Sequence, residues 1–263
     1  MDYLRLLRTD DWLLGFFWIP ILGAVLVSFS FERIVFISLI SFCLFAYAYA
    51  INNYFDVEID KKHSRKIESN RNPLAKENID KKKVLAIISI LFIFPLILSF
   101  YLNFTGFVLV FFSILFSTLY SARGIRLKER TGLDLLTHGF MFGLTPFLAG
   151  VALGGGDISF YSLYIALLFL VINCNVLLVH QMIDYKEDIG NTKSTAIDIG
   201  LKNSFFLFVL LQVIFLVSFI FFTRFFVVDW WIYYLIMFLL LWVPLKYFRK
   251  NRKVYGKLIV WNC

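Results

Sequence analysis

Two short acidic clusters, each at the end of an apolar stretch, hold the residues of this chain whose types and spacing could do chemistry. The residues that recur at a spacing of four are Asn52, Asp56 and Asp60 in the first cluster and His180, Asp184 and Asp188 in the second. Residues four apart lie on one face of a helix, so each set is expected to line up. Carboxylates held this close repel one another unless a cation lies between them, and hard oxygen ligands favour Mg²⁺. We therefore predict that the two clusters form a clamp in which Mg²⁺ bridges to the phosphates of a substrate.

Polar and basic residues in the neighbouring loops could bind the same phosphates. Arg71 lies in the loop after the first cluster, and Arg126 and Lys128 follow the fourth apolar stretch. The planar guanidinium of an arginine can bind a phosphate through two hydrogen bonds, and lysine adds a point charge. Tyr120 could donate a hydrogen bond, and Lys193 follows the second cluster. The alternative for the basic residues is that they only mark the side of a membrane on which their loops lie.

Three further polar residues leave their roles open. His180 could be a neighbour of the metal, a base on the acceptor side or a packed histidine. His138 lies within an apolar stretch beside a glycine and is interpreted as a packing residue. Asp134 begins that stretch next to a basic loop, which suggests pairing with Arg130 or Lys128.

The elements that carry these residues are predicted to be membrane-spanning helices. Of the 263 residues, 60% are hydrophobic and 19% aromatic, and the mean hydropathy is +0.78. Because a spanning helix needs about 20 apolar residues, the chain is predicted to be all-α and polytopic. Eight candidate spans are found: 12–31, 34–53, 84–102, 104–120, 133–153, 160–183, 204–223 and 228–247. A ninth would be counted if the short apolar stretch at 258–261 begins another helix.

Basic residues fix the expected orientation. All but two of the 26 Lys and Arg residues, Arg33 and Arg224, fall at the N-terminus, in the loops after even-numbered spans or in the tail. The positive-inside rule places those segments, and both acidic clusters, in the cytoplasm. The net charge of +8 follows from this topology and needs no nucleic-acid partner. We therefore predict a multi-pass protein of the cell membrane whose site faces the cytoplasm.

The spans group into two halves of four helices within a single domain, 1–263. Half one covers about 1–120 and half two about 121–263, and in each half an acidic cluster follows the second helix. This layout predicts a helical bundle in two halves around a central cavity that opens at the clusters.

At these residues the sequence resembles the UbiA superfamily of intramembrane prenyltransferases. The family signature Asn-Asp-x-x-Asp-x-x-x-Asp is matched by Asn52, Asp56 and Asp60, with Asn53 in place of its first Asp. The second signature resembles Asp184 and Asp188 with the run 192–196 that follows them, and the loops at 71–74 and 120–128 are also similar to the family. The resemblance covers nearly the whole chain, with Asn53 and eight spans instead of nine as its two departures.

The resemblance implies Mg²⁺-dependent transfer of an isoprenoid chain from a prenyl diphosphate to a lipophilic acceptor. It implies that Asn52, Asp56 and Asp60 hold one Mg²⁺ ion and that Asp184 and Asp188 hold another, the four aspartates being catalytic. An aromatic quinone precursor is the first candidate acceptor, and an archaeal ether lipid, made by geranylgeranylglyceryl phosphate prenyl transfer, is the alternative. A carotenoid elongase or a porphyrin farnesylase also belongs to this range. Two other classes fit less well: a CDP-alcohol phosphotransferase needs an Asp-Gly-x-x-Ala-Arg run that is absent, and a cation transporter would carry its carboxylates at mid-membrane.

Overall fold

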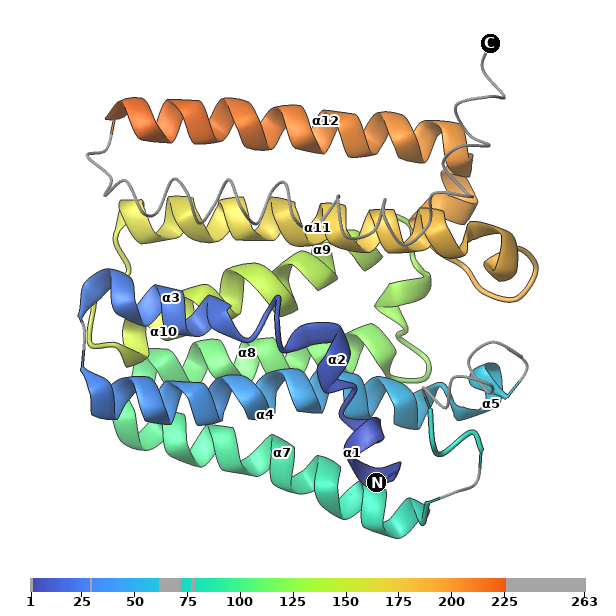
Figure 1. Cartoon of the computed structure of the whole chain (residues 1–263), viewed down its shortest axis with the longest axis horizontal. Coiled ribbons are helices and arrows are strands. Elements are labelled where there is room, and N and C mark those ends of the chain that lie inside the picture. Colours follow the sequence, from blue (N-terminus) through green and yellow to red (C-terminus); the bar gives the residue numbers. More distant parts are fainter. Residues whose placement is uncertain (1, 29, 62–71, 77–78, 226–263) are drawn as a thin grey trace.

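The computed structural model of the chain describes residues 2–28, 30–61, 72–76 and 79–225, and within these ranges it is helical and contains no strand (Figure 1). The elements in chain order are α1 (Asp2–Leu6), α2 (Thr9–Trp12), α3 (Trp18–Val27), α4 (Phe31–Phe55), α5 (Val57–Asp60), α7 (Lys81–Leu102), α8 (Phe104–Ser121), η1 (Leu127–Glu129), α9 (Leu133–Gly139), η2 (Phe140–Leu144), α10 (Thr145–Leu153), α11 (Phe160–Asp188) and α12 (Thr195–Phe225).

Six stretches of the described chain are long and apolar enough to cross a membrane. They are Phe31–Phe55, Lys81–Leu102, Phe104–Ser121, Leu133–Leu153, Phe160–Asp188 and Thr195–Phe221. Each corresponds to a span predicted from the sequence, and Leu133–Leu153 is assembled from α9, the π-helical turn η2 and α10. Large apolar side chains such as Ile90 and Phe206 lie exposed on the sides of the bundle, as expected where lipid replaces water. The predicted span over 228–247 lies outside the described residues.

The first predicted span is wrong in its extent. Residues 13–17 form turns, and the helix that follows, α3, has only ten residues, Trp18–Val27. Pro20 lies in its first turn, where the missing N–H group costs no hydrogen bond, so the proline favours a helix that begins here. A ten-residue helix is about 15 Å long, half of what a single crossing requires.

The helices lie in layers that run along the long axis of the molecule (Figure 1). In that view α11 and α12 form one side, α4 and α7 the other, and α3, α8, α9 and α10 lie between them. The short helix α3 packs closely on α10 because of Gly150: a Cβ there would lie 1.8 Å from the backbone oxygen of Pro20. Such small-residue contacts let membrane helices approach without a driving force from water.

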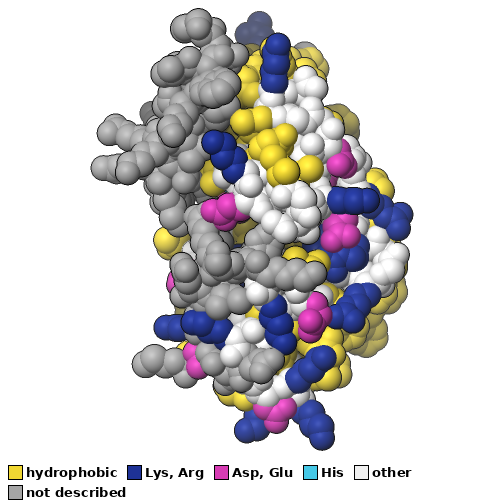
Figure 2. Space-filling view, turned by 90° about the vertical axis from the view of Figure 1, so that its right-hand side faces the viewer, with side chains coloured by type: hydrophobic (Ala, Val, Ile, Leu, Met, Phe, Trp, Pro, Cys, Tyr) yellow, Lys and Arg dark blue, Asp and Glu magenta, His cyan; other side chains and the backbone are white. Residues whose placement is uncertain are grey.

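The chain segments that carry the predicted site gather at one end of the bundle. The C-terminal end of α4 with α5, the connection from α8 to α9 and the connection from α11 to α12 all lie on the right of Figure 1. Seen face-on, this end carries many Lys and Arg side chains interspersed with Asp and Glu (Figure 2). The up-and-down course of the helices therefore brings both acidic clusters and the basic loop to the same end.

Candidate active site

The first acidic cluster lies where α4 gives way to α5. Helix α4 ends at Phe55, and Asp56 adopts φ −94° and ψ 4° before the short helix α5 begins at Val57. The hydrogen bonds from Asp56 N to Asn52 O (3.0 Å) and from Asp60 N to Asp56 O (2.8 Å) keep a helix-like path through this junction. The side chains of Asn52 and Asp56 contact one lysine, whereas the side chain of Asp60 contacts Asn72.

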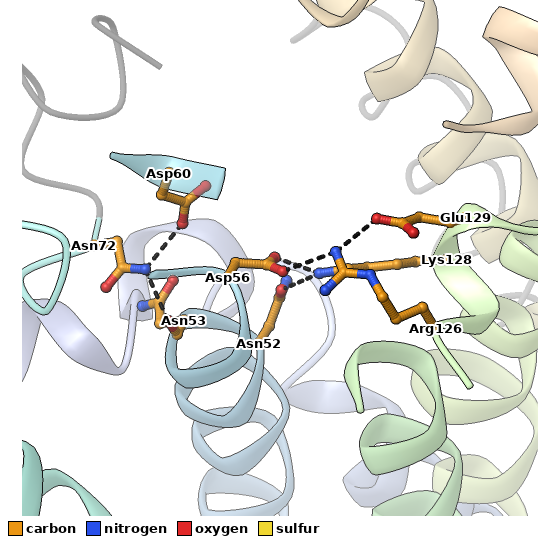
Figure 3. A network of polar contacts seen from close by, with 8 residues as sticks. All are labelled: Asn52, Asn53, Asp56, Asp60, Asn72, Arg126, Lys128 and Glu129. Atoms are coloured by element: carbon orange, nitrogen blue, oxygen red, sulfur yellow. Dashed lines mark hydrogen bonds and ion pairs between the residues drawn. The ribbon is translucent and has the colours of Figure 1, made fainter. Parts of the chain in front are cut away.

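Asn52 and Asp56 meet the same lysine (Figure 3). The Nζ atom of Lys128 donates to Oδ1 of Asn52 at 2.9 Å and forms an ion pair with Oδ2 of Asp56. The other oxygen of Asp56, Oδ1, pairs with an Nη atom of Arg126 at 3.3 Å. A cation is therefore held between the oxygens of Asn52 and Asp56, and two of the residues predicted to bind phosphate touch a predicted metal ligand.

Arg126 is held in this position by unusual backbone geometry. It is one of two non-glycine residues with positive φ in the described chain, at φ 41°, and its guanidinium also binds Glu129 at 2.7 Å. Strained backbone of this kind concentrates at functional sites. The Nε atom of Arg126 is buried without a hydrogen-bond partner among the described residues. Partial burial lowers the pKa of Arg126, but the hydrogen bond to Glu129 and the charge of Asp56 outweigh it, so the pKa lies above its ordinary value and the charge is retained.

Asp60 faces away from this pair and joins a second set of contacts. Nδ2 of Asn72 donates to Oδ2 of Asp60 at 2.9 Å and to the backbone oxygen of Asn53 at 2.8 Å. The side chain of Asn53 points elsewhere, donating from Nδ2 to the backbone oxygen of Leu6 at 3.0 Å. Asn53 is the position at which this chain departs from the superfamily signature. Its side chain thus attaches the N-terminal segment to α4 and does not point toward Asp56.

This contact predicts the result of restoring aspartate at position 53. In Asn53→Asp the carboxylate cannot donate to the oxygen of Leu6, and at 2% exposure it has little access to water. Because a buried group without its partner costs about 1–3 kcal/mol, the midpoint of thermal unfolding in detergent should fall by about 3–10 °C. The Mg²⁺ concentration giving half-maximal activity should stay unchanged.

Asn203→Asp is the matched control for that measurement. Nδ2 of Asn203 also donates to a backbone oxygen, that of Ile199 at 2.8 Å, but the residue is exposed, so its replacement should leave the unfolding midpoint nearly as it was. A lower Mg²⁺ requirement in Asn53→Asp with unchanged stability would instead mean that residue 53 turns toward the metal.

The second acidic cluster lies within the last two turns of α11. The side chains of Asp184 and Asp188 are both half-buried there. The helix stops at Asp188, whose backbone oxygen accepts from Asn191 N and Thr192 N, each at 3.0 Å, and the chain reverses at Gly190 with φ 80°. Lys193 follows in this connection with its side chain exposed. The two clusters thus lie at the ends of different helices, as the sequence predicts.

Asp134 does not pair with Arg130 or Lys128 as expected. Its side chain is completely buried and accepts hydrogen bonds from Nε2 of Gln181 at 2.7 Å and from the backbone nitrogen of Thr195 at 2.8 Å. The hydroxyl of Thr195 also contacts it. The expected salt bridge fails because α9 begins beneath the basic loop, so that its first carboxylate turns inward toward α11.

The predicted packing role of His138 is in agreement with its surroundings. It is buried, with Nδ1 hydrogen-bonded to the backbone oxygen of Asn173 at 3.0 Å and its ring 4.6 Å from that of Phe142 between centroids. Tyr120 is also buried, with its ring 6.5 Å from that of His138. Of the other candidates, His180 is half-buried on α11, and Arg71 lies outside the described residues.

Comparison with known proteins gives the family. The model of the UbiA prenyltransferase family matches residues 13–258. The chain belongs to the UbiA prenyltransferase family. No curated protein matches it.

The fold of this UbiA-family chain is similar to those of several solved structures. A UbiA homolog from Archaeoglobus fulgidus bound to DMAPP and Mg²⁺ matches with a TM-score of 0.80 at 18% identity, over 96% of this chain and 88% of that one. The same homolog bound to GPP and Mg²⁺ matches with a TM-score of 0.80 at 19% identity, with the same coverage. A structure described as digeranylgeranylglyceryl phosphate synthase in membranes matches with a TM-score of 0.69 at 21% identity, over 95% and 88% of the two chains.

The oxygen donors of the first cluster in this UbiA-family chain fit a hard divalent cation. The described residues contain no group of three or more His, Cys, Asp or Glu side chains close enough to hold a metal ion. Asn52 and Asp56 do not form such a group, because Asn52 is an amide and only one of the two is a carboxylate. Oδ1 of Asn52 and Oδ2 of Asp56 nevertheless both contact the ammonium group of Lys128. Mg²⁺ is typically bound by one or two carboxylates together with water and substrate phosphates, so an incomplete protein shell is what such a site needs.

Asn72 contacts Asp60 and Gln181 contacts Asp134, and the spacing of the acidic residues predicts neither contact. Asn72 follows Arg71 in the sequence, and Gln181 lies between His180 and Met182 in the second cluster. Arg8, the other non-glycine residue with positive φ among the described residues, makes a cation–π contact with Tyr49 at 4.9 Å and pairs with Asp11 at 2.6 Å. The signal that could have found both Asn72 and Gln181 is an amide residue next to a candidate site residue, Arg71 or His180.

Proposed function

We propose that this chain is a Mg²⁺-dependent integral membrane prenyltransferase that moves an isoprenoid chain from a prenyl diphosphate to a lipophilic acceptor. The observation that carries the proposal is the contact of Lys128 and Arg126 with Asn52 and Asp56. Phosphate-binding cations and oxygen donors for a metal converge there on one point. Family membership supports the reaction class, and the DMAPP and GPP complexes of the archaeal UbiA homolog support the donor class and the metal.

In this proposal the chain binds and orients a prenyl diphosphate between the two clusters. Asn52, Asp56 and Asp60 would hold one ion, with Asp60 kept in place by Asn72, and Asp184 and Asp188 would hold another. Bound Mg²⁺ supplies neutralisation of the diphosphate as a leaving group. Lys128 and Arg126 would turn from Asp56 to the phosphate oxygens, with Arg71, Tyr120 and Lys193 as further candidates for the same anion.

The apolar interior takes the prenyl chain and excludes water. Phe45 and Phe142 stack at 5.6 Å between ring centroids, and Phe16 lies 4.8 Å from Phe142. These rings lie deeper in the bundle than the acidic clusters, on the side where a chain attached to a bound diphosphate would extend. Aromatic faces also stabilise a nearby cation, which suits an allylic centre that gains positive charge as the C–O bond breaks.

Two acceptor classes remain in this proposal. An aromatic quinone precursor is the first, and a glyceryl phosphate lipid is the second. The structural likeness to a digeranylgeranylglyceryl phosphate synthase supports the second class. Membranes containing the protein should be incubated with radiolabelled geranylgeranyl diphosphate and each acceptor in turn, and the lipid product identified by mass spectrometry. Release of diphosphate with no prenylated product from any acceptor would contradict a transferase.

The proposed orientation predicts which engineered cysteines an impermeant thiol reagent reaches. Lys186 and Asp157 are both exposed and lie at opposite ends of α11 and its preceding connection. Lys186→Cys should react only from the cytoplasmic side and Asp157→Cys only from outside, because the basic loops cluster at the end that carries Lys186. The control is to replace all three native cysteines, Cys43, Cys174 and Cys263, and repeat the labelling, which should change neither pattern. Labelling of both positions from the same side would reject the orientation.

A further inference from the structure

Asp134 is a buried ionisable residue to which the proposed chemistry assigns no role. Its side chain has 0% exposure although it begins α9 at the polar end of the bundle. Both of its oxygens are engaged: Oδ2 accepts from Nε2 of Gln181 (2.7 Å) and from Thr195 N (2.8 Å), and Oδ1 accepts from Leu135 N (2.7 Å) and from the hydroxyl of Thr195. A buried carboxylate is costly unless it is compensated in this way, so the arrangement must be specific.

In the sequence, one partner of Asp134 comes before Asp184 and the other comes after Asp188. Gln181 precedes Asp184 by three residues on α11, and Thr195 begins α12 directly after the connection that follows Asp188. Gln181 closes the set, because its Oε1 accepts from Ala196 N at 3.1 Å. We call Asp134, Gln181 and Thr195 the clamp. It fixes the end of α11 and the start of α12 to one carboxylate.

The clamp also joins the second cluster to the first. Asp134 follows Lys128 by six residues, and Lys128 contacts Asn52 and Asp56. The short connection between them is fastened by a hydrogen bond from Gly132 N to the hydroxyl of Thr195 at 2.7 Å. Asp56 is therefore linked to the end of α11 by its contact with Lys128, by the short connection from Lys128 to Asp134, and by the contact of Asp134 with Gln181.

We propose that Asp134 is a positioning residue that sets the second aspartate cluster at its working distance from the first. Two metal clusters that hold one diphosphate between them must keep their separation closely, since a displacement of about 1 Å can cost 100-fold in rate. Helix ends fray readily, and the end of α11 and the start of α12 are joined by a connection of only six residues, 189–194. The inference rests on the proposed function, because the distance between the clusters matters only if both bind the same substrate.

The test measures metal binding and local order separately from turnover. The probe is Mn²⁺ with inorganic pyrophosphate, followed by the loss of the free-ion EPR signal in detergent. A nitroxide at Lys186→Cys, an exposed position on the last turn of α11, reports the mobility of the cluster. In Asp134→Asn, which keeps the shape but replaces one accepting oxygen by a donor, we expect binding of Mn²⁺ with pyrophosphate to weaken about 10-fold, as expected for a displaced ligand shell, and the nitroxide to become more mobile.

Two further variants keep the outcome decisive. Gln181→Leu removes a neutral partner of the clamp, so it should reproduce both changes even if Asp134→Asn does not fold. Thr145→Val is the matched control. The hydroxyl of Thr145 is buried and hydrogen-bonded to that of Ser113 at 2.7 Å, and neither residue belongs to an acidic cluster or to the clamp. The substitution should therefore lower thermal stability and alter neither readout.

The outcomes separate failure of the inference from failure of the proposed function. Unchanged Mn²⁺ binding in Asp134→Asn and Gln181→Leu, or an equal loss in Thr145→Val, would overturn the positioning role. If the unaltered protein binds no Mn²⁺ with pyrophosphate at all, the proposed function fails. The nitroxide then still decides whether the clamp orders the end of α11.

Discussion

Replacing Asp56 by Asn should reduce Mg²⁺-dependent prenyl transfer at least about 100-fold while the protein remains folded in detergent. The amide has nearly the shape of the carboxylate and keeps one oxygen for Lys128 or Arg126, but it lacks the charge that holds a metal against the leaving diphosphate. Loss of a single electrostatic contact to a developing anion costs about 100- to 1,000-fold in other enzymes. Asp184→Asn should show the same loss through the second cluster.

The measurement is turnover of radiolabelled geranylgeranyl diphosphate at saturating Mg²⁺, with thermal unfolding followed in parallel. Asp157→Asn serves as the control, because Asp157 is an exposed aspartate at the opposite end of the bundle and its replacement should leave turnover unchanged. Near-normal turnover in both Asp56→Asn and Asp184→Asn would reject a mechanism based on the two clusters. A loss in only one variant would mean that a single metal suffices.

The broad architecture could be predicted from the sequence because a membrane-spanning helix requires a long apolar run, which is easy to recognise. Runs of about 20 apolar residues can satisfy their backbone in lipid only as helices, so six predicted spans are found near their expected bounds. The first span fails because hydropathy does not detect a turn inside an apolar segment. At 13–17 the chain leaves the helix, and α3 begins only where Pro20 can enter its first turn.

The site was predictable in its residue types and less so in its contacts. Spacing placed Asn52 and Asp56 together, and the structure brings both to Lys128. Spacing also places Asp60 on the same face, but α4 ends at Phe55, and in the structure the side chain of Asp60 contacts Asn72, twelve residues further along the chain. Periodicity describes a continuous helix, so it cannot show which tertiary neighbour takes a side chain after the helix ends.

The error at Asp134 has the same origin. A carboxylate beside Arg130 and Lys128 in the sequence predicts an ion pair, because opposite charges close in the chain attract. The backbone instead turns Asp134 inward at the start of α9, where amide and hydroxyl donors from α11 and α12 satisfy it. These donors are about 50 to 60 residues away in sequence, a separation at which no local pattern carries information.

Replacing Lys128 by Met should change metal binding and turnover in opposite directions. In the structure Lys128 occupies the space between the oxygens of Asn52 and Asp56, which is where a divalent ion bound to both would lie. Without substrate the ammonium competes with the metal, so its removal should tighten binding of Mn²⁺ alone, measured by EPR. With prenyl diphosphate present the lysine is expected to turn to the phosphates, so its removal should weaken the bound state.

The loss of that charge-assisted contact, at about 1.5–3 kcal/mol, corresponds to a fall of about 10- to 100-fold in kcat/KM. Arg130→Met makes the same change of charge two residues away at an exposed position of the same loop, so it controls for the general field of the basic surface and should alter neither quantity. Weaker binding of Mn²⁺ alone in Lys128→Met would mean that the lysine helps to build the metal site instead of competing for it. Equal effects in both variants would assign the result to the summed charge of the loop, and the contact with Asn52 and Asp56 would then have no separate role in the reaction.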